Sequence, residues 1–172
     1  MIPQIKRVLY ATDLSPNSAY AFRYAVTSAI QHGAAIVILH VFELIPASAR
    51  AMIEPYLTGV QRHKLLEEHA ADAKALIENR IRQFSEKELQ DKAEFENSVI
   101  SIEVCEGFPA EVILTKADEL NCDAIVMGTH GKGNIGHTFF GSTAKRVLRR
   151  TRKPVFIIPL PRGETDITFH DI

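Results

Sequence analysis

Five short apolar runs recur along the chain, and between them apolar residues repeat every three or four positions. The runs cover residues 8–11, 35–39, 99–104, 124–127 and 155–158. Four of the five lack an alternation of apolar and polar residues, which is typical of strands buried on both faces. Strands that alternate with helices along a chain favour a parallel sheet covered by helices. The pattern therefore predicts an α/β fold.

The run at 99–104 differs from the other four. Ser101 and Glu103 alternate there with Ile100, Ile102 and Val104. Such an alternation indicates one buried and one exposed face, and we predict that this strand lies at an edge of the sheet.

Helix start and stop signals stand between the runs. Ser15 and Pro16 predict a helix with a serine cap, and Gly33 predicts its end. Pro109 predicts the start of another helix, and a third is expected over about 142–152. The helical spacing predicts a buried face of the first helix made of Ala19, Phe22, Val26, Ala29 and Ile30.

The segment at about 45–98 is longer than an ordinary crossover between parallel strands. We interpret residues 46–55 as a loop and residues 58–92 as one long helix or two joined helices. The apolar positions on one helical face are Leu66, Ala70, Ala73, Ile77, Ile81 and Phe84. We expect this helical insertion to cover and overhang the sheet; the alternative is a surface that binds a protein partner or a second copy.

Composition limits the possible classes of function. The length of 172 residues fits one domain, and the net charge of −1 argues against binding to nucleic acid or to an anionic membrane. Six basic residues between Lys145 and Lys153 are interpreted as a solvated helix face. No apolar run reaches the length of a membrane span, and Cys105 and Cys122 form no disulfide framework. We expect a cytoplasmic protein.

Glycines crowd the segment that follows the run at 124–127. Four of them fall within nine residues, and Gly141 precedes the expected start of a helix at Ser142. Glycines let backbone N–H groups approach a ligand, and a helix amino end adds further N–H groups, so this segment is suited to phosphates. His130 and His137 lack the further ligands of a metal site, and no catalytic residue is assigned.

Two known phosphate motifs match this segment poorly. A P-loop needs Ser or Thr after its lysine, but Gly133 follows Lys132. Gly131, Gly133 and Gly136 fit the spacing of a dinucleotide motif, but they do not open directly into a helix. A dinucleotide site is therefore the weaker interpretation.

The spacing Gly128-x2-Gly131-x9-Gly141-Ser142 resembles that of the nucleotide-binding branch of the universal stress protein family. The resemblance extends to Thr12-Asp13 with Ser15 and Ser18, His40-Val41, Gly107-Phe108-Pro109-Ala110, Asp123 to Gly128, and Pro154-Val155. It implies a Rossmann-like, three-layer fold of the adenine nucleotide alpha hydrolase type, with a five-stranded parallel sheet. The domain would span 1–160 with the insertion at about 45–98, followed by a polar tail at 161–172.

The resemblance also implies a site for ATP, or another adenine nucleotide, across the strand ends, with Mg²⁺ or Mn²⁺ bridging the phosphates. Asp13 and the backbone of Val41 would meet the adenine. The ribose would be surrounded by Ala11, Thr12, Met127 and Gly128. The phosphates would be held by Gly131, Lys132, Gly141, Ser142 and Thr143.

The function that the resemblance implies is that of a stress-response regulator or nucleotide sensor, forming a homodimer through its last strand, Val155–Ile158. Since no general base or arginine finger can be assigned, we expect at most slow hydrolysis. One alternative is a related α/β enzyme that adenylates a substrate or binds flavin. Another is a nucleotide-free adaptor that acts through the long helical segment.

Overall fold

Five parallel strands form the centre of the computed structural model, which describes residues 2–43, 47–88, 97–129 and 140–159. The sheet has the order β3-β2-β1-β4-β5. Its strands are β1 (Arg7–Thr12), β2 (Ala35–Phe42), β3 (Val99–Glu106), β4 (Ala124–Gly128) and β5 (Val155–Ile158). Each predicted run lies within a strand, and β3 is an edge strand, so both predictions are confirmed.

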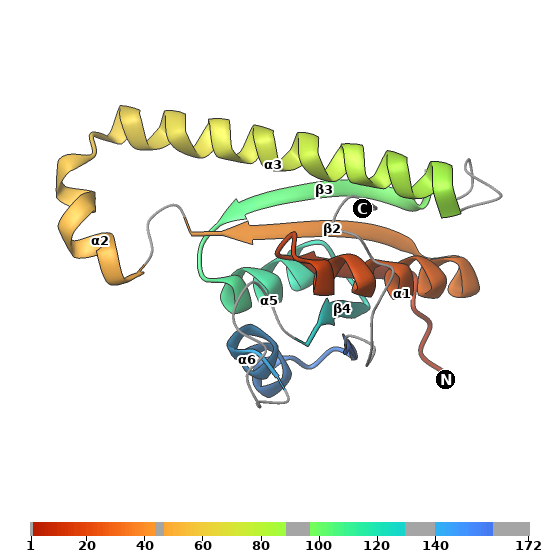
Figure 1. Cartoon of the computed structure of the whole chain (residues 1–172). Coiled ribbons are helices and arrows are strands. Elements are labelled where there is room, and N and C mark those ends of the chain that lie inside the picture. Colours follow the sequence, from red (N-terminus) through yellow and green to blue (C-terminus); the bar gives the residue numbers. More distant parts are fainter. Residues whose placement is uncertain (1, 44–46, 89–96, 130–139, 160–172) are drawn as a thin grey trace.

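Helices cover both faces of the sheet and make the three-layer arrangement (Figure 1). On one face, α1 (Pro16–His32) and α3 (Gly59–Glu88) bury Phe22 and Phe84 against Tyr10 and Ile38. On the other face lie α5 (Pro109–Glu119) and α6 (Ser142–Arg150), which pack on Leu9 of β1. Apolar side chains on both faces of the central strands explain why those strands carry no alternation.

The ends of α1 follow the predicted signals. The hydroxyl of Ser15 accepts a hydrogen bond from the backbone N–H of Ser18, and Gly33 takes the left-handed conformation with φ 59°. The predicted burial of Ile30 is wrong, because this side chain is 49% exposed. Ala21 and Ala25 are buried instead, so the buried face of α1 is rotated around the helix axis away from Ile30.

The prediction of a loop at 46–55 is also wrong. Residues Ala47–Ile53 form a helix, α2, and Glu54–Tyr56 form a short 3-10 helix, η1. Three alanines and a methionine favour the helix. The prolines at 46 and 55 lie outside α2 and do not interrupt its hydrogen bonds.

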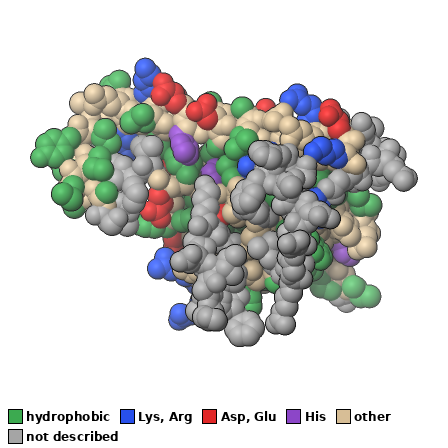
Figure 2. Space-filling model, in the orientation of Figure 1, with side chains coloured by type: hydrophobic (Ala, Val, Ile, Leu, Met, Phe, Trp, Pro, Cys, Tyr) green, Lys and Arg blue, Asp and Glu red, His purple; other side chains and the backbone are tan. Residues whose placement is uncertain are grey.

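The long helix α3 is a single helix that overhangs the sheet, as expected. It buries Ala73, Ile77 and Phe84, but its amino end and α2 extend beyond the carboxyl ends of β2 and β3 (Figure 1). Apolar side chains gather on this extension (Figure 2), including Tyr56, which is 85% exposed, and Val60, which is 82% exposed. Within the described ranges, no helix is both long and apolar enough to cross a membrane.

Cys122 gives a testable property of the folded core. Burial raises the pKa of its thiol above the ordinary value of 9.0, although Arg7 and Lys153 oppose the shift. The unfolded chain therefore loses this proton at a lower pH than the folded chain does. We expect the free energy of unfolding to decrease as the pH rises above 9.0, and denaturant unfolding at several pH values measures this. Cys122→Ala should make the decrease smaller; an unchanged slope would contradict the assignment.

Candidate functional site

The carboxyl ends of β1 and β4 lie side by side at the point where their connections diverge. Ala11 on β1 is paired with Met127 on β4. β1 leads into α1 on one face of the sheet, whereas the helix after β4, α6, lies on the other face. Ligands of open α/β sheets bind in the crevice at such a topological switch point. The fold therefore places the candidate site beyond these two strand ends.

The turn after β1 carries Asp13 and caps α1. Asp13 Oδ1 accepts hydrogen bonds from the Ser15 backbone N–H at 3.1 Å and from its hydroxyl at 2.5 Å. The Thr12 hydroxyl donates to Ser18 Oγ at 3.0 Å. The amino end of α1 is thus satisfied by its own sequence and holds Asp13 in a fixed position.

Leu14 has an unusual backbone conformation within this turn. Its φ of 63° lies in the left-handed region, which costs an ordinary L-residue roughly 1–2 kcal/mol. Its N–H donates to Thr12 Oγ1 at 3.0 Å, and Leu14 immediately follows Asp13. Strained residues of this kind occur where the surrounding structure enforces a functional geometry.

Two buried side chains stabilise the end of β1. His40 Nδ1 lies 2.8 Å from the carbonyl oxygen of Thr12, and because a carbonyl only accepts, Nδ1 is the donor. The Tyr10 hydroxyl donates to the Ser18 carbonyl at 2.6 Å. Burial raises the pKa of Tyr10, so the phenol remains a neutral donor at physiological pH. From the sequence, His40 is predicted only to lie at the end of a strand, and its contact with Thr12 is not predicted.

The end of β4 is built around Gly128 and Asn17. A Cβ atom on Gly128 would lie 2.9 Å from Asn17 Nδ2, so any larger residue here would displace the Asn17 side chain. Asn17 is 4% exposed, and its Nδ2 lies 3.5 Å from the Thr129 hydroxyl. Sequence reasoning missed Asn17; a polar residue beside the apolar face of a predicted helix is the feature that would have indicated it.

The amino end of α6 is available for a ligand. The Gly141 N–H donates to the Thr129 carbonyl at 2.7 Å, which fixes the start of α6 beside the end of β4. Among the described residues, no side chain caps α6, and its first turn contains no acidic residue. With respect to the described residues, the N–H groups of this turn are therefore free to bind an anion, whereas those of α1 are already capped.

The structure brings together most of the predicted site residues that it describes. Thr12, Asp13 and Gly128 meet at the switch point, and Gly141 is joined to it through Thr129. Val41 lies on β2, which is adjacent to β1. Other predicted residues that are described are Ala11 and Met127, whose side chains are buried, half-buried Thr143 and exposed Ser142. Gly131 and Lys132 lie outside the described residues, as do His130 and His137.

No group of three or more His, Cys, Asp or Glu side chains that could hold a metal ion occurs in the described part of the chain. Asp13 is the acidic side chain at the switch point, and one of its oxygens is engaged by Ser15. A single carboxylate with neighbouring hydroxyls suits a cation that is held mainly by phosphate oxygens.

Comparison with known sequences identifies a family. The model described as the universal stress protein family matches residues 4–159. Universal stress protein MJ0577 of Methanocaldococcus jannaschii is similar to this chain, with 26% identity over 156 residues that cover 89% of this chain and 94% of that protein.

Comparison with solved structures agrees with the fold. The structure of hypothetical protein MJ0577 has a TM-score of 0.69 and 23% identity, and the match covers 94% of this chain and 100% of that one. UspA from Lactobacillus plantarum has a TM-score of 0.67 and 24% identity, and the match covers 91% of this chain and 99% of that one. A universal stress protein in complex with cAMP has a TM-score of 0.50 and 22% identity, and the match covers 91% of this chain and 98% of that one. The Rossmann-like α/β fold is confirmed.

Proposed function

Because the chain belongs to the universal stress protein family, we propose that it binds ATP or another adenine nucleotide beyond the ends of β1 and β4. It would act as a stress-response regulator or nucleotide sensor. The observation that carries the proposal is the amino end of α6, which no described side chain caps and which is joined to Thr129 at the topological switch point. The cAMP complex of a structural neighbour supports adenine nucleotides as the class of ligand.

The phosphates would lie at the first turn of α6. Backbone N–H groups there, together with the hydroxyls of Ser142 and Thr143, match the acceptor oxygens of a phosphate. Lys145 and Arg146 on the next turn are exposed and add positive charge. Gly131 and Lys132, in the loop before α6, would complete this part of the site.

The adenine and ribose would lie over β1, β2 and β4. Asp13, whose carboxylate is oriented by Ser15, and the half-buried Val41 backbone would meet the adenine. Ala11 is 8% and Met127 6% exposed, so these residues would form an apolar floor and contact the ribose mainly through backbone atoms, beside Thr12 and Gly128.

The proposal includes at most slow hydrolysis. The Asp13 carboxylate accepts two hydrogen bonds from Ser15, which hold it at the start of α1, where it would meet the adenine. Phosphoryl transfer requires a positioned water and charge stabilisation at the γ-phosphate, and Asp13 is not placed for either. Mg²⁺ or Mn²⁺ would arrive with the nucleotide and neutralise phosphate charge; the Ser142 hydroxyl is the candidate protein ligand.

A homodimer through β5 belongs to the same proposal. β5 ends the sheet opposite β3, and Phe156 on it is 37% exposed. An apolar edge strand favours pairing with a second copy.

The free thiols of Cys105 and Cys122 fit a cytoplasmic setting. The proposed domain is 1–160, with 45–98 as its insertion.

Calorimetric titration tests the proposed ligand. We expect saturable binding of ATP to the full chain, stronger with Mg²⁺ or Mn²⁺ than with a chelator, and weaker binding of AMP and cAMP because they place less phosphate charge at α6. Mass spectrometry of the ligand that co-purifies with the protein would identify the nucleotide independently. If no adenine nucleotide binds, the proposed function is wrong.

Exposed apolar side chains favour one second candidate, an adaptor that acts through α2 and the start of α3. Met52 is 74% exposed, and Tyr56 and Val60 more so. Such an exposed set is typical of a surface that contacts another protein. Purification without bound nucleotide, together with failure of the titration, would favour this function.

A further inference from the structure

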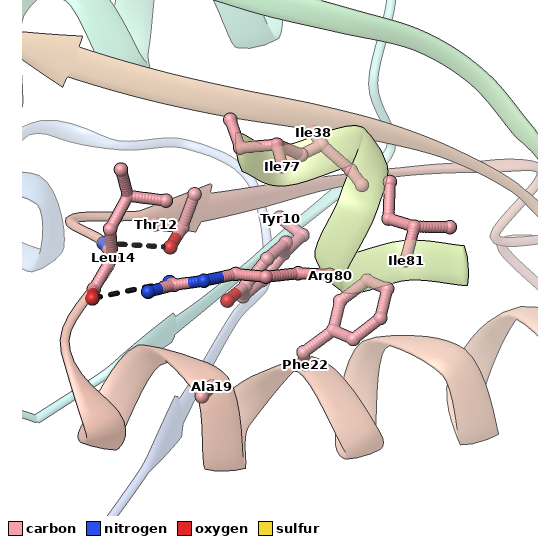
Figure 3. A pocket seen from close by; sticks show the side chains of 9 residues that line it. All are labelled: Tyr10, Thr12, Leu14, Ala19, Phe22, Ile38, Ile77, Arg80 and Ile81. Atoms are coloured by element: carbon pink, nitrogen blue, oxygen red, sulfur yellow. Dashed lines mark hydrogen bonds between the residues drawn. The ribbon is translucent and has the colours of Figure 1, made fainter. Parts of the chain in front are cut away.

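The turn that carries Asp13 is held from outside by the long helix α3. Arg80 of α3 lies 66 residues after Leu14 in the chain, and its Nη1 donates to the Leu14 carbonyl at 3.3 Å. Figure 3 shows the Arg80 side chain extending from α3 past Tyr10 to this carbonyl. A hydrogen bond from a charged donor is stronger than one between neutral groups.

The Leu14 side chain also contacts the layer formed by α1 and α3. It packs against the core cluster that contains Ile77 and Phe84. Leu14, Arg80 and Ile81 together line a cavity of about 30 Å³ beside Tyr10. Such a space holds one or two waters, so the turn and α3 are in contact but not tightly packed. The turn is thus free to adjust when the Arg80 contact is lost.

Residues of the turn itself bind two of its backbone N–H groups, whereas the Leu14 carbonyl is bound by a residue of α3. Thr12 Oγ1 fixes the Leu14 N–H, and Asp13 Oδ1 fixes the next N–H, that of Ser15. Arg80 binds the carbonyl of the Leu14–Ser15 peptide, whose N–H donates to Asp13 Oδ1. Because the N–H of this peptide binds Asp13 Oδ1, a rotation of the peptide at left-handed Leu14 would release the Asp13 carboxylate from its present orientation.

We propose that Arg80 is a positioning residue for the nucleotide-binding turn: it holds Leu14 in the left-handed conformation and thereby orients Asp13. The proposal rests on the proposed function. It makes the insertion part of the site, because the packing of α3 on the sheet then affects nucleotide affinity. By reciprocity, bound nucleotide would strengthen the contact of α3 with the turn.

Arg80→Met tests the proposal directly. Methionine keeps an apolar stem beside Ile77 and Ile81 but removes the donor. We expect the Kd for ATP to rise about tenfold, with the circular dichroism spectrum unchanged. Arg82→Met is the matched control, because Arg82 is exposed on the same helix and donates to Asn79 instead. The control should change the Kd less than about twofold.

A second background separates positioning from general stability. Glycine adopts the left-handed conformation without strain, so in Leu14→Gly the turn no longer needs Arg80. In the Leu14→Gly protein, Arg80→Met should therefore change the Kd for ATP less than about twofold. In the protein with Leu14 retained, Arg80→Lys keeps a donor and should lose less affinity than Arg80→Met does. An equal loss in both backgrounds, or no loss in either, would overturn the proposal.

A measurement without nucleotide distinguishes this proposal from the proposed function. Arg80→Met should shift the amide NMR signals of Asp13, Leu14 and Ser15 in the free protein, and Arg82→Met should not. If these signals do not move, Arg80 does not set the turn. If they move but the unchanged protein binds no adenine nucleotide, the proposed function fails while the role of Arg80 in setting the turn stands.

Discussion

Replacement of Gly141 by valine is expected to abolish ATP binding while the fold is retained. Gly141 precedes the first turn of α6 with φ −65° and ψ 164°, a conformation that valine also adopts. The substitution therefore adds a Cβ atom and two methyl groups at the helix amino end without straining the backbone. They would occupy space that the phosphates need in order to reach the N–H groups.

The expected size of this effect is large. Loss of the phosphate contacts should raise the Kd for ATP by at least about 100-fold, which corresponds to about 2.7 kcal/mol of binding free energy. The stability of the protein should change far less, by about 1 kcal/mol, because valine is a poorer helix cap than glycine. Calorimetric titration and denaturant unfolding measure the two quantities separately.

Gly59→Val provides the control for this substitution. Gly59 is the first residue of α3, and a Cβ atom there would meet nothing within 4 Å. The same chemical change at another helix amino end should leave ATP binding intact. If Gly141→Val binds ATP as tightly as Gly59→Val does, the phosphates do not lie at α6.

Phe22→Ala is expected to cause the largest loss of stability. Phe22 is 2% exposed, and its ring centroid lies 5.0 Å from that of Tyr10 and 5.2 Å from that of Phe84. The ring therefore joins α1, β1 and α3. Its removal should lower the free energy of unfolding by about 3–5 kcal/mol, because it leaves a cavity that the three elements fill only in part.

Denaturant unfolding of Phe22→Ala should be compared with that of Ile30→Ala. Ile30 lies on the same helix but is 49% exposed, so the loss there should stay within about 0.5 kcal/mol. Similar losses for both variants would contradict the burial described here. Because Phe22 also supports α3, we expect Phe22→Ala to weaken ATP binding as well, through the loosened contact of Arg80 with Leu14.

Local patterns account for the part of the fold that sequence analysis predicted correctly. The apolar runs predict the strands because every position that faces the core is apolar, on both faces in the central strands and on one face in β3. Ser15, Gly33 and Pro109 predict helix ends because capping depends on a few adjacent residues. The same local reasoning fails for α2, because residues 46–55 are predicted as a loop whereas Ala47–Ile53 form a helix between two prolines.

Contacts between distant residues account for what sequence analysis missed. Asn17 meets Thr129 across 112 positions, and Arg80 meets Leu14 across 66. Neither pair leaves a periodic pattern, because each depends on how α1 and α3 lie on the sheet. The sequence assigned Gly128 to a ligand, whereas the structure adds a packing reason, the close approach of Asn17.

The chain's sequence alone was sufficient for the α/β class, the strands and most helix boundaries, since hydrophobic periodicity and capping are local properties. The candidate nucleotide residues stay a prediction from the resemblance to the family. Only the folded arrangement shows that the amino end of α6, uncapped by any side chain in the described ranges, lies beside β4, and that Arg80 of α3 binds the turn after Asp13. Those features depend on strand order and helix packing, which bring together residues that are far apart in the chain.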